Sequence, residues 1–103
     1  SAAIKLLQLL KKNKINNIFG HDFIISKNAI EDLGVCHCSI EKGFKDADVV
    51  VFMNNHKSYF DLNIEKLVKK MKKGGLIFDG WQIFLEQLKD NNYIKYESIG
   101  FKK

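Results

Sequence analysis

Apolar side chains recur along the chain at two spacings, one typical of helices and one typical of strands. Residues 2–12 place apolar side chains at positions i, i+3, i+4 and i+7, which predicts an amphipathic helix. Residues 63–73 repeat this spacing, with Asn63 in position to cap the helix. Residues 48–54 contain three consecutive valines and no alternation, as expected of a strand covered on both faces. The chain therefore combines amphipathic helices with at least one buried strand.

Four further segments have the length and apolar character of strands. They are residues 17–22, 35–39, 75–80 and 93–100, the last with the alternation of a strand near a sheet edge. Short helices fit between them, because Ser26 and Ser39 can each cap one and a third surrounds Leu85 and Leu88. Strands separated by helices predict an α/β fold with a mainly parallel sheet. Because the chain has 103 residues, which is the usual size of one domain, we expect a single domain over positions 1–103.

Polar side chains cluster where three of these strands end, and ligands of parallel sheets bind outside the carboxyl ends of the strands. The candidates for a ligand contact are Asp22, Asn54, His56, Asp79, Gly80 and Trp81. Asp22 suits either a ribose contact or a turn that caps its own loop. His56 suits a phosphate contact, acid–base chemistry or a polar loop that satisfies the end of the strand. Trp81 is the sole tryptophan and suits either stacking on a base or sugar, or covering the core or an interface.

The chain is basic, with a formal net charge of +5, but its 17 basic residues are all lysine. Arginine supplies most bidentate recognition of bases and phosphates, so its absence argues against a nucleic-acid partner. The lysines are dispersed, and the densest group, within residues 69–73, lies on the polar side of a predicted helix. We therefore expect no nucleic-acid partner.

Cys36 and Cys38 lie one residue apart in a predicted strand, where a disulfide between them would be strained. A structural zinc site needs four ligands, and His37 would face away from both thiols, so no metal site is predicted. Apolar packing of reduced cysteines fits better. No apolar run approaches the roughly 20 residues of a membrane span, and the amino terminus does not resemble a secretory signal. The expected location is cytoplasmic, without membrane association.

The sequence contains few of the motifs expected of a self-contained enzyme. It has no G-x-G-x-x-G loop, which argues against NAD binding by this chain. It also has no serine or cysteine with an evident base and no carboxylate pair at a telling spacing. No catalytic residue is therefore predicted in the chain.

Residues 47–84 resemble the last domain of the UDP-glucose/GDP-mannose dehydrogenases. The matching positions are Ala47-Asp48-Val49-Val50-Val51, His56, Phe60, Leu62 and Ile77-Phe78-Asp79-Gly80. Looser matches are Ser1-Ala2-Ala3, Phe19-Gly20-His21-Asp22 and Tyr96-Glu97-Ser98-Ile99-Gly100. The resemblance implies a Rossmann-like three-layer sandwich that binds a nucleotide sugar, with UDP favoured over GDP.

The resemblance also implies that the chain is a fragment of a larger dehydrogenase. Enzymes of this family oxidise the C6 alcohol of a UDP-sugar to the carboxylate of a UDP-uronic acid, for surface polysaccharide, in two NAD-dependent steps. It implies that NAD is bound by an amino-terminal domain outside this chain and that a central domain forms a homodimer or a higher homo-oligomer. The 103-residue chain by itself is expected to be inactive.

The chain departs from the family pattern at three points. Trp81 stands where the family has an arginine that contacts the substrate, and Asn54 stands where it has a threonine. The family's first strand, with its A-F-K segment, is not in the chain, so we expect a trimmed piece, a proteolytic remnant or a strand supplied by another copy. These departures motivate the alternative function, a non-catalytic Rossmann-like binding or assembly module with a decayed ligand site. Nucleic-acid binding ranks behind both.

Overall fold

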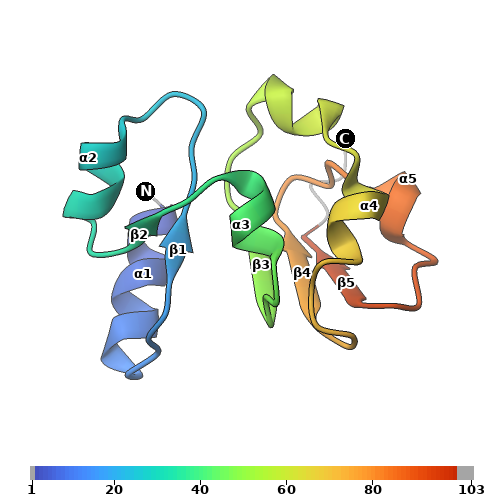
Figure 1. The fold of residues 1–103 in the computed structure, drawn as a ribbon, viewed down its shortest axis with the longest axis horizontal. Coiled ribbons are helices and arrows are strands. Elements are labelled where there is room, and N and C mark those ends of the chain that lie inside the picture. The colour runs from blue at the N-terminus through green and yellow to red at the C-terminus, as the bar shows by residue number, and fades with distance from the viewer. Residues whose placement is uncertain (1, 100–103) are drawn as a thin grey trace. The chain divides into compact units, whose positions relative to one another are not determined.

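A computed structural model describes residues 2–99, so Ser1 and Gly100, two of the family-like positions, lie outside the described residues. The chain divides into two compact units, Ser1–Gly43 and Phe44–Lys103. Each unit contains helices and one sheet, and the strands of both sheets pair in parallel (Figure 1). This confirms the predicted α/β class with parallel strands.

Within residues 2–43, the first unit has two short strands and two complete helices, and a third helix crosses its boundary with the second unit. Its elements are α1 (Ala2–Lys12), β1 (Phe19–Gly20), α2 (Lys27–Asp32) and β2 (Cys36–His37). β1 and β2 pair with Phe19 opposite Cys36. α2 begins at the predicted cap, where Ser26 Oγ accepts a hydrogen bond from the backbone N–H of Ala29 at 3.2 Å. The helix is followed by Gly34, whose φ of +82° is the left-handed conformation that commonly ends helices.

The core of the first unit is small. Its buried apolar side chains are Ile30, Val35 and Cys38. Gly20 allows β1 to approach two of them, because a Cβ there would lie 2.9 Å from Val35 Cγ2 and 3.1 Å from Ile30 Cγ2. α1 has no buried residue, so its predicted apolar stripe is only partly covered. The short strands and the small core make this the more lightly packed unit.

The second unit is built on a three-stranded sheet. α3 (Ile40–Phe44) leads into it along the chain, and its elements are β3 (Val49–Phe52), the 3-10 helix η1 (Lys57–Asp61), α4 (Ile64–Val68), β4 (Leu76–Asp79), α5 (Leu85–Leu88) and β5 (Lys95–Ser98). β4 is the central strand, between β3 and β5 (Figure 1). Phe52, Asp79 and Ser98 are in register, so the carboxyl ends of the three strands meet at one edge. The alternating strand β5 lies at the side of the sheet, as predicted.

Aromatic rings occupy the centre of the second unit. Its buried apolar side chains are Phe44, Phe52, Tyr59, Ile64, Leu67, Val68, Met71, Ile77, Ile83, Phe84, Leu88 and Ile94. The ring of Phe52 contacts those of Phe84 and Tyr59 edge-to-face, with centroid distances of 5.0 and 5.6 Å. These contacts hold the end of β3 against the segments that follow β3 and β4.

β3 is not covered on both faces, so that part of the prediction from the three valines is wrong. The side chains of Val49 and Val51 are 53% and 37% exposed, whereas Phe52 is buried. Successive side chains of a strand point to opposite faces, so Val49 and Val51 share the face that is open. The apolar run reflects a strand with one covered face.

α4 is shorter than predicted. The apolar spacing predicts a helix to residue 73, but α4 ends at Val68. Beyond it the backbone N–H groups of Lys70 and Met71 bond to the carbonyls three residues earlier, of Leu67 and Val68, which tightens the chain into turns. Met71 is nevertheless buried, so the apolar spacing predicts the buried positions correctly even beyond the end of the helix. The Asn63 cap is present, since its Oδ1 accepts the Lys66 N–H at 3.3 Å.

Candidate functional site

Five of the six predicted site residues lie together in the second unit, at the carboxyl ends of β3 and β4. They are Asn54, His56, Asp79, Gly80 and Trp81. Two contacts join the segments that follow the two strands: Gly80 N–H donates to the carbonyl of Phe52 at 3.0 Å, and Trp81 Nε1–H donates to the carbonyl of Met53 at 3.2 Å. The sixth residue, Asp22, belongs to the first unit.

Asp79 is fully buried, with 0% of its side chain exposed. Its Oδ1 accepts the backbone N–H of Trp81 at 3.2 Å, and its Oδ2 accepts the N–H of Phe84 at 2.8 Å. Oδ2 also accepts the hydroxyl of Tyr96 at 2.7 Å. Hydrogen bonds to an ionised carboxylate are among the strong ones, so these three donors fix the chain that follows β4. The carboxylate thus holds the turn from within, and direct contact with a ligand is not its role in this arrangement.

Tyr96 is the residue of this site that the sequence analysis missed. It lies on β5 opposite Ile77, on the same face of the sheet as Asp79 and diagonal to it. The alternation of residues 93–100 places Tyr96 on one face of the strand, but a diagonal partner is fixed only by the register with β4. Burial, and then the hydrogen bond to Asp79, raise the pKa of the Tyr96 hydroxyl well above its ordinary value.

Because the pKa of Tyr96 is raised, the stability of the second unit should decrease at alkaline pH. The Tyr96 contribution should be fully present below the unfolded-state pKa of about 10 and lost as pH rises above it, because only the unfolded chain then releases the proton readily. We expect the difference in urea midpoint between the wild type and Tyr96→Phe to shrink between pH 9 and pH 11. Trp81 fluorescence measures the unfolding, and a difference that stays constant over this range would contradict the assignment.

Trp81 is half-exposed, with 45% of its side chain accessible, at the turn that follows β4. Gly80 permits the close approach of this turn to β3, because a Cβ there would lie 3.1 Å from the carbonyl oxygen of Phe52. Gln82 has a φ of +54°, a left-handed conformation unusual for a residue with a side chain. An indole anchored at Nε1 and exposed beside two strand ends can offer its ring face to a planar or sugar ligand.

Asn54 and His56 form a compact turn after β3. Asn54 Oδ1 accepts the backbone N–H of His56 at 3.0 Å, and His56 Nδ1 accepts the N–H of Ser58 at 3.1 Å. His56 thereby caps the 3-10 helix η1. Because Nδ1 is an acceptor, the neutral ring carries its hydrogen on Nε2. The two side chains therefore satisfy backbone groups at the strand end, as in the polar-loop interpretation, and His56 Nε2–H has the chemistry of a donor to a phosphate or hydroxyl oxygen.

Asp22 adopts the turn-capping arrangement in the first unit. Its Oδ1 accepts the backbone N–H groups of Ile24 and Ile25 at 2.7 and 3.0 Å. The neighbouring His21 contacts the ring of Phe23 edge-to-face, with centroids 4.8 Å apart. Burial, together with the nearby His37, lowers the pKa of His21. These contacts of His21 and Asp22 are thus with residues of the loop that follows β1.

Cys36 and Cys38 are both free thiols, Cys36 exposed and Cys38 buried. Burial raises the pKa of Cys38, which favours an inert, packed thiol over a nucleophile. Within residues 2–99, no three His, Cys, Asp or Glu side chains lie close enough to hold a metal ion. No helix formed by these residues is long and apolar enough to cross a bilayer.

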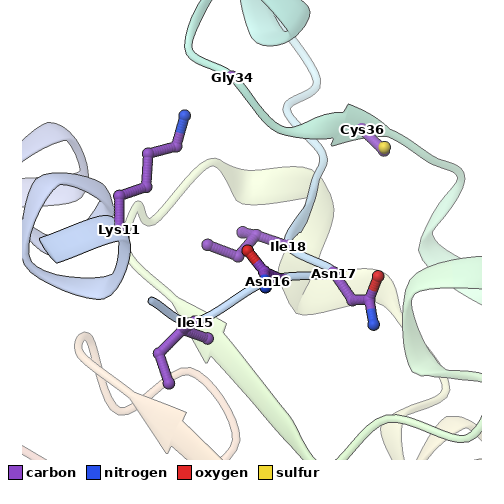
Figure 2. Close-up of a pocket in the computed structure, with 7 residues that line it drawn as sticks. All are labelled: Lys11, Ile15, Asn16, Asn17, Ile18, Gly34 and Cys36. Carbon is purple, nitrogen blue, oxygen red and sulfur yellow. The ribbon is translucent and has the colours of Figure 1, made fainter. Parts of the chain in front are cut away.

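A hollow of about 400 Å³ lies in the first unit, away from the predicted contacts of that unit. Its lining residues are Lys11, Ile15, Asn16, Asn17, Ile18, Gly34 and Cys36 (Figure 2). They come from the end of α1, the segment before β1 and the start of β2, whereas Asp22 follows β1. Lys11 Nζ donates to the carbonyl of Leu33 at 3.3 Å across its rim. The hollow therefore lies at the amino ends of the strands and contains none of the six predicted site residues.

Parallel strands joined by helices, with polar and aromatic groups gathered at the carboxyl ends, define an α/β domain of the Rossmann-like type. The family model for the UDP-binding domain of the UDP-glucose/GDP-mannose dehydrogenase family matches residues 1–86. The chain belongs to this dehydrogenase family, and the predicted family membership is confirmed.

Among solved structures, the chain is similar to Salmonella D-lactate dehydrogenase, with 21% sequence identity and a TM-score of 0.62. The similarity covers 92% of this chain but only 31% of that one, so the chain spans about a third of the length of its structural relative. At this identity the likeness concerns the fold alone, and it confirms the Rossmann-like class. No curated protein matches the chain.

Proposed function

We propose that the chain is the nucleotide-sugar-binding domain of an NAD-dependent nucleotide-sugar 6-dehydrogenase that converts a UDP-sugar to a UDP-uronic acid. The observation that carries this proposal is the hydrogen bond from Trp81 to the carbonyl of Met53, directly before the Asn54–His56 turn, at the carboxyl ends of β3 and β4. The chain that makes this contact belongs to a family of UDP-binding domains. Ligands of parallel α/β sheets bind at this edge.

Each of the five residues has a distinct part in the proposed site. The indole face of Trp81 stacks on the uracil ring or on the sugar, where the family has an arginine. His56 donates from Nε2 to a phosphate or ribose oxygen, in the tautomer that its Nδ1 contact sets. Asn54 holds the backbone of that turn and presents its amide N–H₂ at the same strand end. Asp79 and Gly80 shape the turn that carries Trp81.

The chemistry of oxidation is assigned to other parts of the proposed parent enzyme. None of the seven glycines lies in a G-x-G-x-x-G loop, so the residues of this chain do not fit NAD, which we place on an amino-terminal domain. The chain alone is proposed to be inactive. The parent is proposed to be a cytoplasmic homo-oligomer that supplies uronic acid for surface polysaccharide, without nucleic-acid or membrane partners.

The proposal predicts that UDP binds the chain and that Trp81→Ala weakens this binding by about tenfold or more. Stacking of a base on an aromatic side chain contributes roughly 1–3 kcal/mol, and 1.4 kcal/mol corresponds to tenfold in affinity. Isothermal titration calorimetry with UDP, UDP-glucose, GDP and NAD measures the affinities, with UDP and UDP-glucose expected to bind and NAD not. A matched control is Phe19→Ala, which removes an exposed aromatic side chain of the first unit and should leave the UDP affinity unchanged.

A second candidate function is a non-catalytic binding or assembly module. It is favoured by the tryptophan that replaces the family's arginine and by the buried Asp79 carboxylate, which accepts three hydrogen bonds from within the chain. Failure of both the chain and the larger protein to bind UDP or GDP, together with self-association in sedimentation analysis, would support this candidate over the enzyme domain.

A further inference from the structure

Three strands of the second unit are connected at their carboxyl ends by a chain of hydrogen bonds. On β5, the hydroxyl of Tyr96 donates to Asp79 Oδ2 of β4 at 2.7 Å. Asp79 Oδ1 accepts the backbone N–H of Trp81 at 3.2 Å. The indole of Trp81 donates from Nε1 to the carbonyl of Met53, directly after β3, at 3.2 Å. The chain runs from the side strand β5, across the central strand, to the half-exposed aromatic ring.

The turn that carries Trp81 needs to be held in place. Gln82 adopts a left-handed φ of +54°, and residues in such conformations persist where the surrounding contacts over-determine them. Asp79 supplies those contacts on both sides of Gln82, through the N–H groups of Trp81 and Phe84. The Asp79 carboxylate can accept from the N–H groups of Trp81 and Phe84 at the same time only while its side chain keeps one rotamer. The short hydrogen bond from the Tyr96 hydroxyl to Oδ2 fixes that rotamer.

We propose that Tyr96 is a positioning residue, which through Asp79 sets the orientation of the Trp81 indole for stacking on a pyrimidine nucleotide. The choice of a pyrimidine nucleotide as the ligand rests on the proposed function. The positioning of Trp81 by Tyr96 does not, because it is a property of the ligand-free chain. Tyr96 acts at a distance from the ligand and makes no contact with it.

The test compares Tyr96→Phe with Tyr93→Phe. Each removes one hydroxyl from a half-buried tyrosine, since Tyr93 donates to the carbonyl of Met71 at 2.9 Å, so the two changes are chemically matched. Trp81 is the sole tryptophan, so acrylamide quenching and polarisation of its emission report on this side chain alone. Tyr96→Phe should raise the quenching constant roughly twofold and weaken UDP binding roughly fivefold to tenfold, as expected from the loss of one hydrogen bond to a charged group. Tyr93→Phe should change neither.

The outcomes separate this inference from the proposed function. If the wild type does not bind UDP but Tyr96→Phe still mobilises Trp81, the proposed function fails and the positioning role stands. If UDP binds the wild type and Tyr96→Phe alters neither quenching nor affinity, or no more than Tyr93→Phe does, the positioning role is overturned.

A second variant covers the case in which Tyr96→Phe does not fold, as judged by circular dichroism. Asp79→Asn keeps the side-chain volume and one carbonyl oxygen, but its amide N–H₂ group cannot accept a hydrogen bond. Because an amide cannot accept from Tyr96, Trp81 and Phe84 as the carboxylate does, increased quenching of Trp81 is expected. Unchanged quenching in a folded Asp79→Asn protein would overturn the inference.

Discussion

Replacing Asp79 with alanine is expected to lower the free energy of unfolding of the second unit by about 4 kcal/mol. The change leaves three donors without their acceptor, namely the backbone N–H groups of Trp81 and Phe84 and the hydroxyl of Tyr96. A buried donor left unsatisfied costs roughly 1–3 kcal/mol. Only the bond from Phe84 is buried, those from Trp81 and Tyr96 are part-buried, and the three groups share a small region, so the costs add only in part. Urea denaturation followed by Trp81 fluorescence measures the loss, because Trp81 lies in this unit.

Asp90 offers a matched control for this change. It is exposed and lies in the same unit, close after α5. Asp90→Ala should shift the free energy of unfolding by less than about 0.5 kcal/mol, as surface substitutions usually do. A loss below about 1 kcal/mol for Asp79→Ala would mean that water or a rearranged turn replaces the carboxylate, and that the connection from Tyr96 to Trp81 carries little energy.

Phe84→Ala is expected to cost a similar amount, about 4 kcal/mol, through a different physical cause. Phe84 has no exposed surface, and its ring meets that of Phe52 edge-to-face at 5.0 Å. Truncating a buried phenylalanine loses its transfer free energy and leaves a cavity, which together cost about 3–5 kcal/mol. The unfolding free energy from urea denaturation is the measurement.

Phe60→Ala is the control, because Phe60 is 52% exposed and belongs to the same unit. It should cost less than about 1 kcal/mol. Equal losses for the two phenylalanines would show that the buried ring is not central to the packing of the unit.

Features set by local chemistry could be predicted from the sequence. The caps at Ser26 and Asn63 depend on a side chain that reaches backbone groups three residues away, and both are present. The parallel strands and the carboxyl-end position of Trp81 also follow from the order of apolar segments and turn residues. The apolar period does not locate the end of α4, because it continues to Met71 although the backbone has already tightened into turns.

Features that depend on the pairing of distant segments could not be predicted. The sequence places Asp79 correctly at the end of β4, but its burial depends on where Tyr96, 17 residues further on, falls in the register of β5. The open face of β3 depends on what packs against the sheet, which three successive valines do not reveal. Asp22 has the same type of position as Asp79, yet it caps its own loop.

The light packing of the first unit has a consequence for the order in which the chain opens. Regions with few buried apolar contacts unfold locally at a lower cost than the densely packed core. α1 has no fully buried side chain, and the strands β1 and β2 are two residues long, so amide protons there should exchange with solvent through small fluctuations. The Tyr96–Asp79–Trp81 connection lies in the unit with the aromatic core, where exchange requires a much larger opening. The groups proposed to hold the nucleotide thus belong to the last part of the chain to lose its structure.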